Sequence, residues 1–231
     1  MNPSVKYHDK LAAEWEGKYK KRSFLSRANA LLSLLNGADL EGKKWLDAGC
    51  GTGTLSRLLS EHGCIVHGVD ASPAMVEIAK EMASRNIRSS DMTFEVIETV
   101  EKLPFPDRFF DGVLCSSVIE YLDYPEVCLQ EFSRVLKKGG LVLVSVPNQH
   151  SLYRFVERIF FYFSDRVLNH PYPAYLKFLK HMYSPSEFSR LLNGVGINAI
   201  RSTKAGLGLP GFIDRFTCIA TMLFVLATKN T

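Results

Sequence analysis

From residue 44 onward, short apolar runs alternate with longer amphipathic stretches. Short apolar runs bounded by turn residues predict buried strands, and apolar positions that recur every three or four residues predict the helices between them. The predicted strands are 44–47, 64–69, 93–97, 110–115, 141–146, 197–203 and 220–228. Alternation of this kind is typical of a parallel sheet covered by helices on both faces, and we expect the last two strands to pair with each other.

Residues 3–36 are predicted to be helical, because apolar side chains recur at four-residue spacing from Tyr7 to Tyr19 and a second pattern follows over 26–35. These helices precede the first strand. They could therefore fold over a ligand bound at the sheet or pack against the sheet edge. A further helix is predicted over 125–136, before the strand 141–146.

The alternation stops over residues 150–181, which hold nine of the chain's 26 aromatic residues and five basic residues against two acidic ones. A helical pattern places seven apolar residues on one face: Leu152, Phe155, Val156, Ile159, Phe160, Phe163 and Val167. Ser184-Pro185-Ser186-Glu187 then has the form of a capping box and predicts a helix that continues to Leu192.

Composition adds limits to this picture. The chain has 231 residues, 46% of them apolar and 23% charged, which suffices for one folded domain with a real core. A net charge of +4 without a basic block does not favour a nucleic-acid partner. The five cysteines (50, 64, 115, 128 and 218) form no CxxC pair, so we expect reduced cysteines of a cytoplasmic protein and no metal site.

Residues 45–55 combine the end of the first strand, a turn with glycines at 49, 51 and 53, and the start of a helix. Glycine lets the backbone approach a ligand closely, and a helix N-terminus offers unpaired N–H groups. Nucleotide-like ligands bind at such a turn in open α/β sheets. Asp70, 19 residues past Gly51 at the end of the second strand, could accept hydrogen bonds from both hydroxyls of a ribose.

Two ligands fit a glycine turn followed by such a carboxylate: a dinucleotide and S-adenosylmethionine. A dinucleotide site has the pattern G-x-G-x-x-G, whereas this turn is G-x-G-x-G and is preceded by Asp47. An acid beside a pyrophosphate would repel it, but it could pair with the ammonium group of a methionine moiety. The residues therefore favour S-adenosylmethionine.

The stretch 45–148 resembles the class I S-adenosylmethionine-dependent methyltransferases that act largely on small molecules. The matching segments, in order, are 46–53, 68–73, 103–105 with 109–111, and 134–140. The resemblance implies a doubly wound seven-stranded sheet in the order 3-2-1-4-5-7-6, with strand 7 antiparallel, N-terminal helices and a helical insert after strand 5. The chain would be one domain: a cap (1–40), a cofactor-binding core (44–148), an aromatic insert (150–183), and a final helix with a strand hairpin (184–231).

The resemblance also implies which residues contact the cofactor. The methionine portion would meet Asp47, Gly49, Cys50 and Gly51, the ribose Asp70, the adenine Ala71, Thr99 and Val100, and the sulfonium end Ser116. Thr99 stands where the family often has the acid that meets the adenine amino group. If the acceptor must lose a proton, the candidate bases are His150, Tyr121 and Glu120, with His150 favoured because it follows a strand's carboxyl end.

The expected activity is methyl transfer to a small, apolar or aromatic acceptor, and the spacing after strand 5 is similar to that of quinone-precursor O-methyltransferases. Three interpretations of 150–183 stay open: a lid over its own core, an acceptor pocket built from Phe160, Phe161, Tyr162 and Phe163, and a peripheral membrane contact through 151–168. Alternative functions are a non-catalytic S-adenosylmethionine-binding module and a tRNA or protein methyltransferase.

Overall fold

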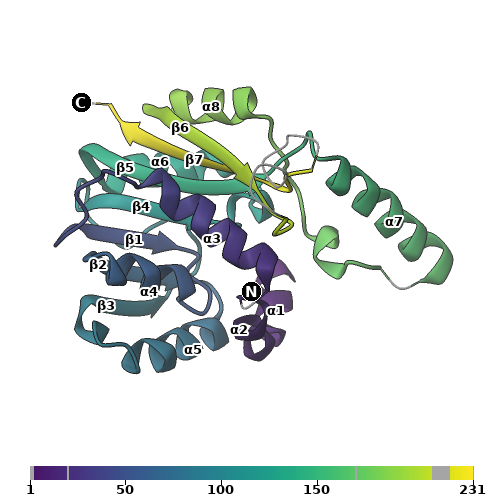
Figure 1. Cartoon of the computed structure of the whole chain (residues 1–231), viewed down its shortest axis with the longest axis horizontal. Coiled ribbons are helices and arrows are strands. Elements are labelled where there is room, and N and C mark those ends of the chain that lie inside the picture. The colour runs from purple at the N-terminus through teal and green to yellow at the C-terminus, as the bar shows by residue number, and fades with distance from the viewer. Residues whose placement is uncertain (1–2, 20, 170, 210–218, 231) are drawn as a thin grey trace.

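The structure is a computed structural model that describes residues 3–19, 21–169, 171–209 and 219–230. Its centre is one sheet in the order β3-β2-β1-β4-β5-β7-β6 (Figure 1). The strands are β1 (Lys44–Ala48), β2 (Ile65–Asp70), β3 (Met92–Val96), β4 (Phe110–Ser116), β5 (Leu136–Pro147), β6 (Ile197–Ala205) and β7 (Met222–Lys229). β7 runs antiparallel to β5 and β6, while the other neighbours are parallel. The predicted order and strand directions are confirmed.

Helices cover both faces of the sheet, and each face has its own apolar core. One face carries α3 (Arg22–Leu34), α4 (Thr54–Glu61) and α5 (Pro73–Ser84), and the other carries α6 (Pro125–Val135) and α8 (Pro185–Gly194). Ser184 caps α8 and exchanges hydrogen bonds with Glu187, so the predicted capping box is confirmed. Strands buried on both faces explain why their sequences are nearly continuous apolar runs rather than alternating ones.

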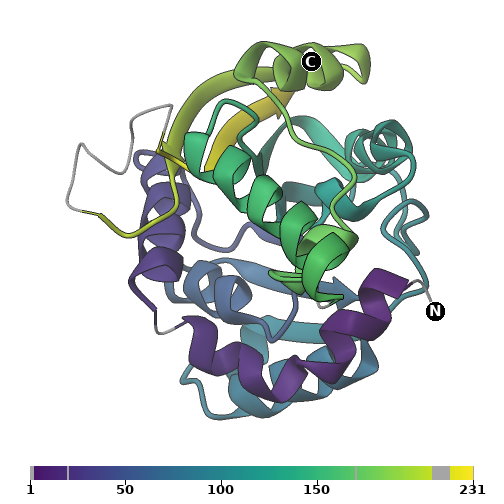
Figure 2. The same cartoon turned by 90° about the vertical axis from the view of Figure 1, so that its right-hand side faces the viewer.

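Two short helices, α1 (Pro3–Lys10) and α2 (Ala12–Tyr19), lie across the edge where the parallel strands end (Figure 2). They pack against α5 on the sheet face that α3 also covers. The carboxylate of Asp9 holds α1 in place, because its Oδ1 accepts hydrogen bonds from the Ser72 hydroxyl at 2.5 Å and from the Ala74 amide at 3.2 Å. The N-terminal segment therefore reaches the carboxyl edge of the sheet.

The connection between α6 and β5 differs from the prediction. The helix ends at Val135 and β5 begins at Leu136, so 136–140 are strand where the sequence suggested the end of a helix and a turn. Lys137 ties this segment to β4 through an ion pair of 2.7 Å with Asp111. Gly139, at a φ of +70°, supplies the left-handed conformation at the irregular part of the ladder.

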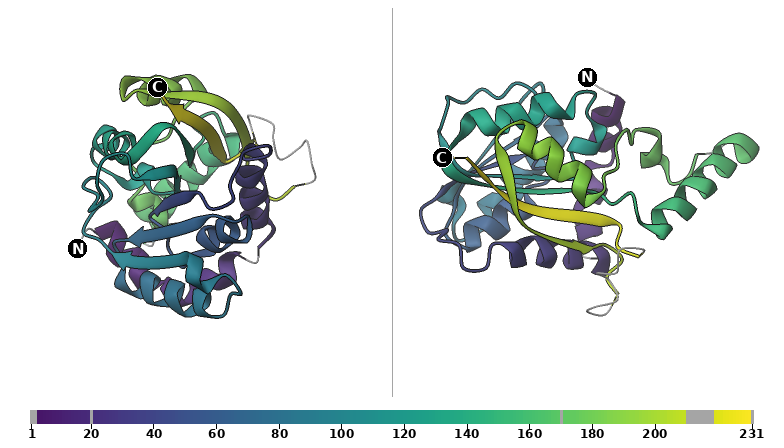
Figure 3. Two further views of the ribbon diagram at one scale, coloured as in Figure 1. Left: turned by 90° about the vertical axis from the view of Figure 1, so that its left-hand side faces the viewer. Right: turned by 90° about the horizontal axis from the view of Figure 1, so that it is seen from above.

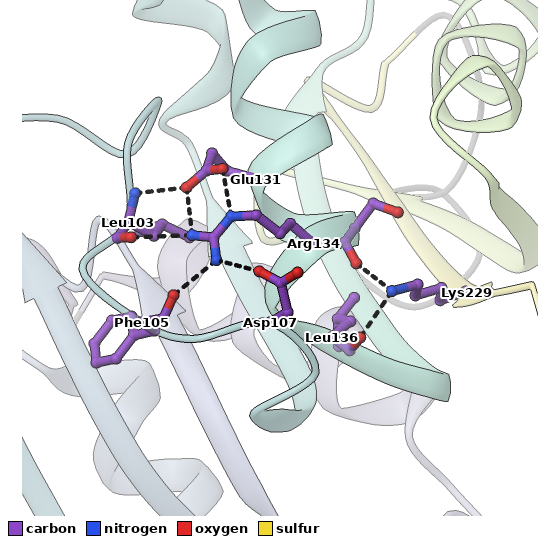
Figure 4. A network of polar contacts seen from close by, with 8 residues as sticks. Leu103, Phe105, Asp107, Glu131, Arg134, Leu136 and Lys229 are labelled. Carbon is purple, nitrogen blue, oxygen red and sulfur yellow. Dashed lines mark hydrogen bonds and ion pairs between the residues drawn. The ribbon is translucent and has the colours of Figure 1, made fainter.

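Arg134, on α6, fixes the loop 103–107 that precedes β4 (Figure 4). Its guanidinium pairs with Glu131 and Asp107 and donates to the carbonyl oxygens of Leu103 and Phe105 at 3.0 and 2.8 Å. Glu131 in turn accepts a hydrogen bond from the Leu103 amide at 2.8 Å. The loop is therefore held at the backbone of Leu103 and Phe105 and at the side chain of Asp107.

After β5 the chain forms α7 (Leu152–Leu168), which projects from the body of the molecule (Figures 1 and 3), and the short helix η3 (Ala174–Lys177), which packs against it. The predicted apolar face of α7 exists, but it points into solvent: Phe155, Ile159 and Phe163 are 60%, 56% and 51% exposed. Among the described residues, no helix combines the length and the apolar character that crossing a bilayer demands.

Candidate active site

A cavity of about 450 Å³ opens at the carboxyl edge of the sheet. Its floor is formed by the turn after β1, the residues that follow β2, and the loops 98–101 and 116–118. Its outer wall comes from the N-terminal segment, through side chains of α1, α2 and α3. The N-terminal helices thus cover the cavity as well as packing on the sheet, which combines the two possibilities that the sequence left open.

The turn after β1 is held against β2, because the amides of Gly49 and Cys50 both donate to the Val69 carbonyl, at 2.8 and 3.0 Å. Gly49 and Gly51 have positive φ angles of 77° and 53°. A Cβ on Gly49 would lie 2.2 Å from Cγ2 of Val118, so any side chain there would clash with the loop after β4.

Asp47 lies at the bottom of the cavity and is 1% exposed. Its Oδ2 accepts a hydrogen bond of 2.5 Å from the Ser56 hydroxyl of α4. Burial raises the pKa of this carboxyl to about 7; the Ser56 hydrogen bond opposes the rise and the charge of Asp70 adds to it. A cationic ligand group in the cavity would stabilise the ionised form and remove much of the cost of burying it.

Asp70 is positioned by backbone amides at both oxygens. Gly51 donates to Oδ2 and Ser72 to Oδ1, each at 2.8 Å. Burial raises the pKa of Asp70, although these amides and the nearby charge of His8 oppose the rise. A carboxylate has about four acceptor positions, so two remain for hydroxyl groups of a ligand.

The loop 98–101 contains a carboxylate that the sequence interpretation missed. The Thr99 hydroxyl donates to Oε2 of Glu101 at 3.2 Å and accepts from the Glu101 amide at 3.1 Å. Oε1 of Glu101 is buried and has no hydrogen-bond partner among the described residues. Because Glu101 also lines the cavity, this loop offers an acid two residues beyond the position where the family often has one.

Arg27 of α3 is the second missed residue. It lines the cavity, its guanidinium lies 5.1 Å from the Phe24 ring, and it donates to the Thr221 hydroxyl at 3.3 Å. Its Nε is buried without a hydrogen-bond partner among the described residues. Burial and the neighbouring charge of Arg154 lower the pKa of Arg27 to about 10. A buried donor without an acceptor is costly, which favours an anionic ligand group here.

All nine residues expected to bind the cofactor line this single cavity: Asp47, Gly49, Cys50, Gly51, Asp70, Ala71, Thr99, Val100 and Ser116. The three candidate bases are dispersed. Tyr121 lines the cavity and packs against the His8 ring, 5.3 Å away. Glu120 is buried and is not among the lining residues; burial raises the pKa of its carboxyl to about 7.

The structure does not support His150, the residue that the sequence favoured as the base. It is exposed and does not line the cavity. The strand β5 ends at Pro147, and the amide of His150 donates to Oδ1 of Asn148, which turns the chain toward α7. Being near a strand's carboxyl end was therefore insufficient, because the three residues that follow the strand lead away from the cavity.

Two interpretations of the aromatic insert 150–183, as a lid over its own core and as the acceptor pocket, are also wrong. Phe160, Tyr162 and Phe163 are 49%, 64% and 51% exposed and take no part in the cavity wall, so α7 neither encloses a core nor forms the acceptor pocket. Aromatic rings of the N-terminal helices do line the cavity. Those that line the cavity are His8, Trp15 and Phe24.

A seven-stranded sheet in this order, with a glycine turn and two carboxylates at its carboxyl edge, defines the Rossmann-like methyltransferase fold. Residues 46–144 match the family described as "Methyltransferase domain". The solved structure of magnesium protoporphyrin IX methyltransferase from Synechocystis PCC 6803, with bound SAH, has a TM-score of 0.70 to this chain at 16% identity, covering 94% of this chain and 93% of that one.

Several curated relatives bear the name ubiquinone biosynthesis O-methyltransferase, among them the following two. The protein of Coxiella burnetii (strain Dugway 5J108-111) is 32% identical over 111 residues, 48% of this chain and 46% of its own length. That of Thiobacillus denitrificans (strain ATCC 25259 / T1) is 27% identical over 193 residues, 84% of this chain and 81% of its own. The match to a methyltransferase domain thus covers residues 46–144, and the chain spans about half the length of the first curated relatives it matches.

Proposed function

We propose that the protein transfers a methyl group from S-adenosylmethionine to an oxygen atom of a small, apolar or aromatic acceptor. The observation that supports this most is that two carboxylates, Asp47 and Asp70, line one cavity beside the same glycine turn. Asp70 accepts a hydrogen bond from the Gly51 amide of the turn, and Asp47 accepts one from Ser56 of the helix that follows it. The choice of oxygen follows the names of the two curated relatives above.

The cavity has a complementary group for each part of the cofactor. Asp47 would meet the methionine ammonium, and the unpartnered Nε of Arg27 suits the methionine carboxylate. Asp70 would accept the ribose hydroxyls, and Oε1 of Glu101 suits the adenine amino group beside Ala71, Thr99 and Val100. Gly49, Cys50 and Gly51 would lie along the methionine, and Ser116 near the sulfonium.

The acceptor would enter between the loop 116–121 and the aromatic rings of the N-terminal helices. Methyl transfer from a sulfonium is an in-line displacement, so the protein's part is mainly to align the acceptor and exclude water. Burial, together with the charge of Glu120, raises the pKa of Tyr121, which therefore remains protonated. Tyr121 would orient the acceptor as a hydrogen-bond donor rather than remove its proton.

Two measurements test the proposal. Isothermal titration with S-adenosylmethionine should show binding that Gly51→Val abolishes, because a β-branched residue does not tolerate a φ of 53°. Cell extract incubated with labelled cofactor and the protein should then yield label in the organic-soluble fraction. Label only in the macromolecular fraction would indicate a tRNA or protein methyltransferase. Binding without any transfer would indicate a non-catalytic module.

We also propose that the protein acts in the cytoplasm, at the surface of a membrane that it contacts through 151–168. The helix α7, whose apolar residues face solvent, supports this placement. A lipophilic acceptor dissolved in the bilayer would then be close to the cavity.

A further inference from the structure

The helix α7 has the reverse of the usual amphipathic arrangement. Its least exposed side chains are polar or sit among polar ones: Arg154, Glu157, Phe161 and Ser164. The opposite face consists of large apolar side chains, each about half or more exposed: Leu152, Phe155, Val156, Ile159, Phe160, Phe163 and Val167. Solvent-exposed apolar patches of this size mark interaction sites.

Hydrogen bonds on the polar face fix this orientation. Arg154 pairs with Glu157 at 3.0 Å, donates to the hydroxyl of Tyr175 on η3, and reaches the Thr221 carbonyl at 3.4 Å. Further along, the Ser164 hydroxyl accepts from the Tyr172 amide at 2.9 Å and donates to the Tyr172 carbonyl at 3.1 Å. Rotating the apolar face inward would break these hydrogen bonds, and Arg154 and Ser164 would lose their partners without replacement. The hydrogen bonds of the polar face therefore hold the apolar face toward solvent.

The exposed charges of α7 and η3 are mainly positive. The buried Arg154–Glu157 pair is neutral, which leaves Arg158 and Arg166 against Asp165 on the helix. Lys177 of η3, which packs against α7, is exposed as well. Aromatic residues with a polar atom, Tyr153, Tyr162 and Tyr172, lie beside the apolar face and are 46%, 64% and 61% exposed. Such rings favour the boundary between water and lipid.

The size of the face favours a lipid surface over a second copy of the chain. With 17 residues, α7 is about 25 Å long and about 10 Å wide, so its face offers a few hundred Å². A stable protein–protein interface needs roughly 800 Å² from each partner. A helix that lies in a lipid interface needs only its own apolar face and flanking cations.

We infer that the outward face of α7 inserts into the surface of an anionic membrane, with Arg158, Arg166 and Lys177 contacting lipid headgroups. The helix projects from the carboxyl edge of the sheet, the edge at which the cavity opens (Figures 1 and 2). This inference deepens the proposed function, because membrane contact would bring a lipophilic acceptor to that cavity, but the contact itself can be measured without turnover.

The test is flotation of the full chain with vesicles of phosphatidylcholine alone and of phosphatidylcholine with phosphatidylglycerol. The wild-type protein should float with the anionic vesicles and be released by added salt, since screening weakens the headgroup contacts. Ile159→Glu should lower the vesicle-bound fraction about tenfold. Ile87→Glu is the matched control: the same change at a fully exposed isoleucine outside α7, which should bind as the wild type does.

Each other outcome overturns the inference. If the vesicle-bound fraction of the wild type stays at background with anionic vesicles, the protein does not contact the membrane. If Ile159→Glu and Ile87→Glu lower the bound fraction equally, α7 is not the contacting element. A concentration-dependent dimer in light scattering that Ile159→Glu abolishes would assign the face to a second copy. Titration with S-adenosylmethionine on the same variant separates these results from failure of the proposed function, because the cofactor site should bind normally.

Discussion

Asp47 and Asp70 lie under the same turn, yet their surroundings prepare them for different partners. Asp70 receives two backbone amides, so its charge is partly satisfied before any ligand arrives. Asp47 accepts only one side-chain hydrogen bond, from the Ser56 hydroxyl, and it is almost completely buried. A cationic group beside it would therefore stabilise its ionised form. A neutral ribose and a positively charged ammonium match these two states.

The pH dependence of Asp47 gives the first prediction. Burial raises its pKa to about 7, so between roughly pH 4 and pH 7 the folded protein binds one proton more than the unfolded chain. The contribution of this group to stability without ligand is present at low pH and is lost as the pH rises through about 7. Asp47→Asn should therefore unfold at higher urea concentration than the wild type at about pH 8, by on the order of 2 kcal/mol, and this advantage should fade near about pH 5.

The same substitution should weaken S-adenosylmethionine binding, because Asn cannot pair with an ammonium group. In the wild type, affinity measured by titration should increase as the pH rises through about 7, the pH range in which Asp47 ionises. A pH-independent affinity, or a variant that binds as tightly as the wild type, would contradict the assigned role.

Asp70 gives the second prediction. Asp70→Asn keeps the size of the side chain but loses the charge that strengthens hydrogen bonds to ribose hydroxyls. We expect the affinity for S-adenosylmethionine to fall about tenfold to hundredfold in titration calorimetry, since charged hydrogen bonds contribute about 1.5–3 kcal/mol each. Asp91→Asn, on the short helix η1 (Ser89–Asp91) outside the cavity, is the control and should bind normally.

Local sequence was sufficient for the residues of the turn and insufficient for Arg27. Asp47, Gly49 and Gly51 lie within five residues of one another, so one motif determines their arrangement. Arg27 meets them only because α3 packs on β6 and β7, a contact between distant parts of the chain. Its sole signal in the sequence was a position in the helix that precedes the glycine turn.

At the scale of elements, Arg134 connects α6 to the loop that continues from the cavity wall (Figure 4). Arg134→Ala should lower the free energy of unfolding by about 2 kcal/mol, because the Leu103 and Phe105 carbonyls lose a charged donor. It should also weaken cofactor binding several-fold through loop 98–101. Urea unfolding and titration measure the two effects.

Arg85→Ala is the matched control for Arg134→Ala. Arg85, at the C-terminal end of α5, likewise pairs with a glutamate one turn earlier, Glu81, at 2.6 Å, but both partners are exposed. An exposed pair of this kind contributes at most about 0.5 kcal/mol. Equal losses in the two variants would show that Arg134 acts as an ordinary surface ion pair and does not organise the loop.

The elements also show what periodicity can and cannot predict. The apolar face of α7 was predictable from residue spacing, and the helix formed where the spacing placed it. The direction of that face was not, because it depends on Arg154 and Ser164 finding partners in η3, Thr221 and Tyr172, which lie outside the helix. A pattern identifies a face; tertiary hydrogen bonds decide what it meets.

At the scale of the whole molecule, the sheet order could be predicted because it follows from the family resemblance and the strand-then-helix alternation. The composition of the cavity's outer wall could not, since α1 and α2 contribute to it only through their docking on α5. The few contacts of these short helices make them the part of the cavity most easily opened. Ligand entry past them is therefore the simplest route to the buried carboxylates.

This arrangement gives a last prediction, for amide hydrogen exchange. S-adenosylhomocysteine should slow exchange across residues 3–19 far more than across the sheet, because a ligand that binds the closed form suppresses local opening of α1 and α2. Asp9→Asn weakens the contact of α1 with the Ser72 hydroxyl and the Ala74 amide. It should speed exchange in 3–10 without ligand and lower cofactor affinity several-fold while leaving exchange in β4 and β5 unchanged. Protection confined to the glycine turn would mean that the N-terminal helices pack on the sheet without closing over the cofactor.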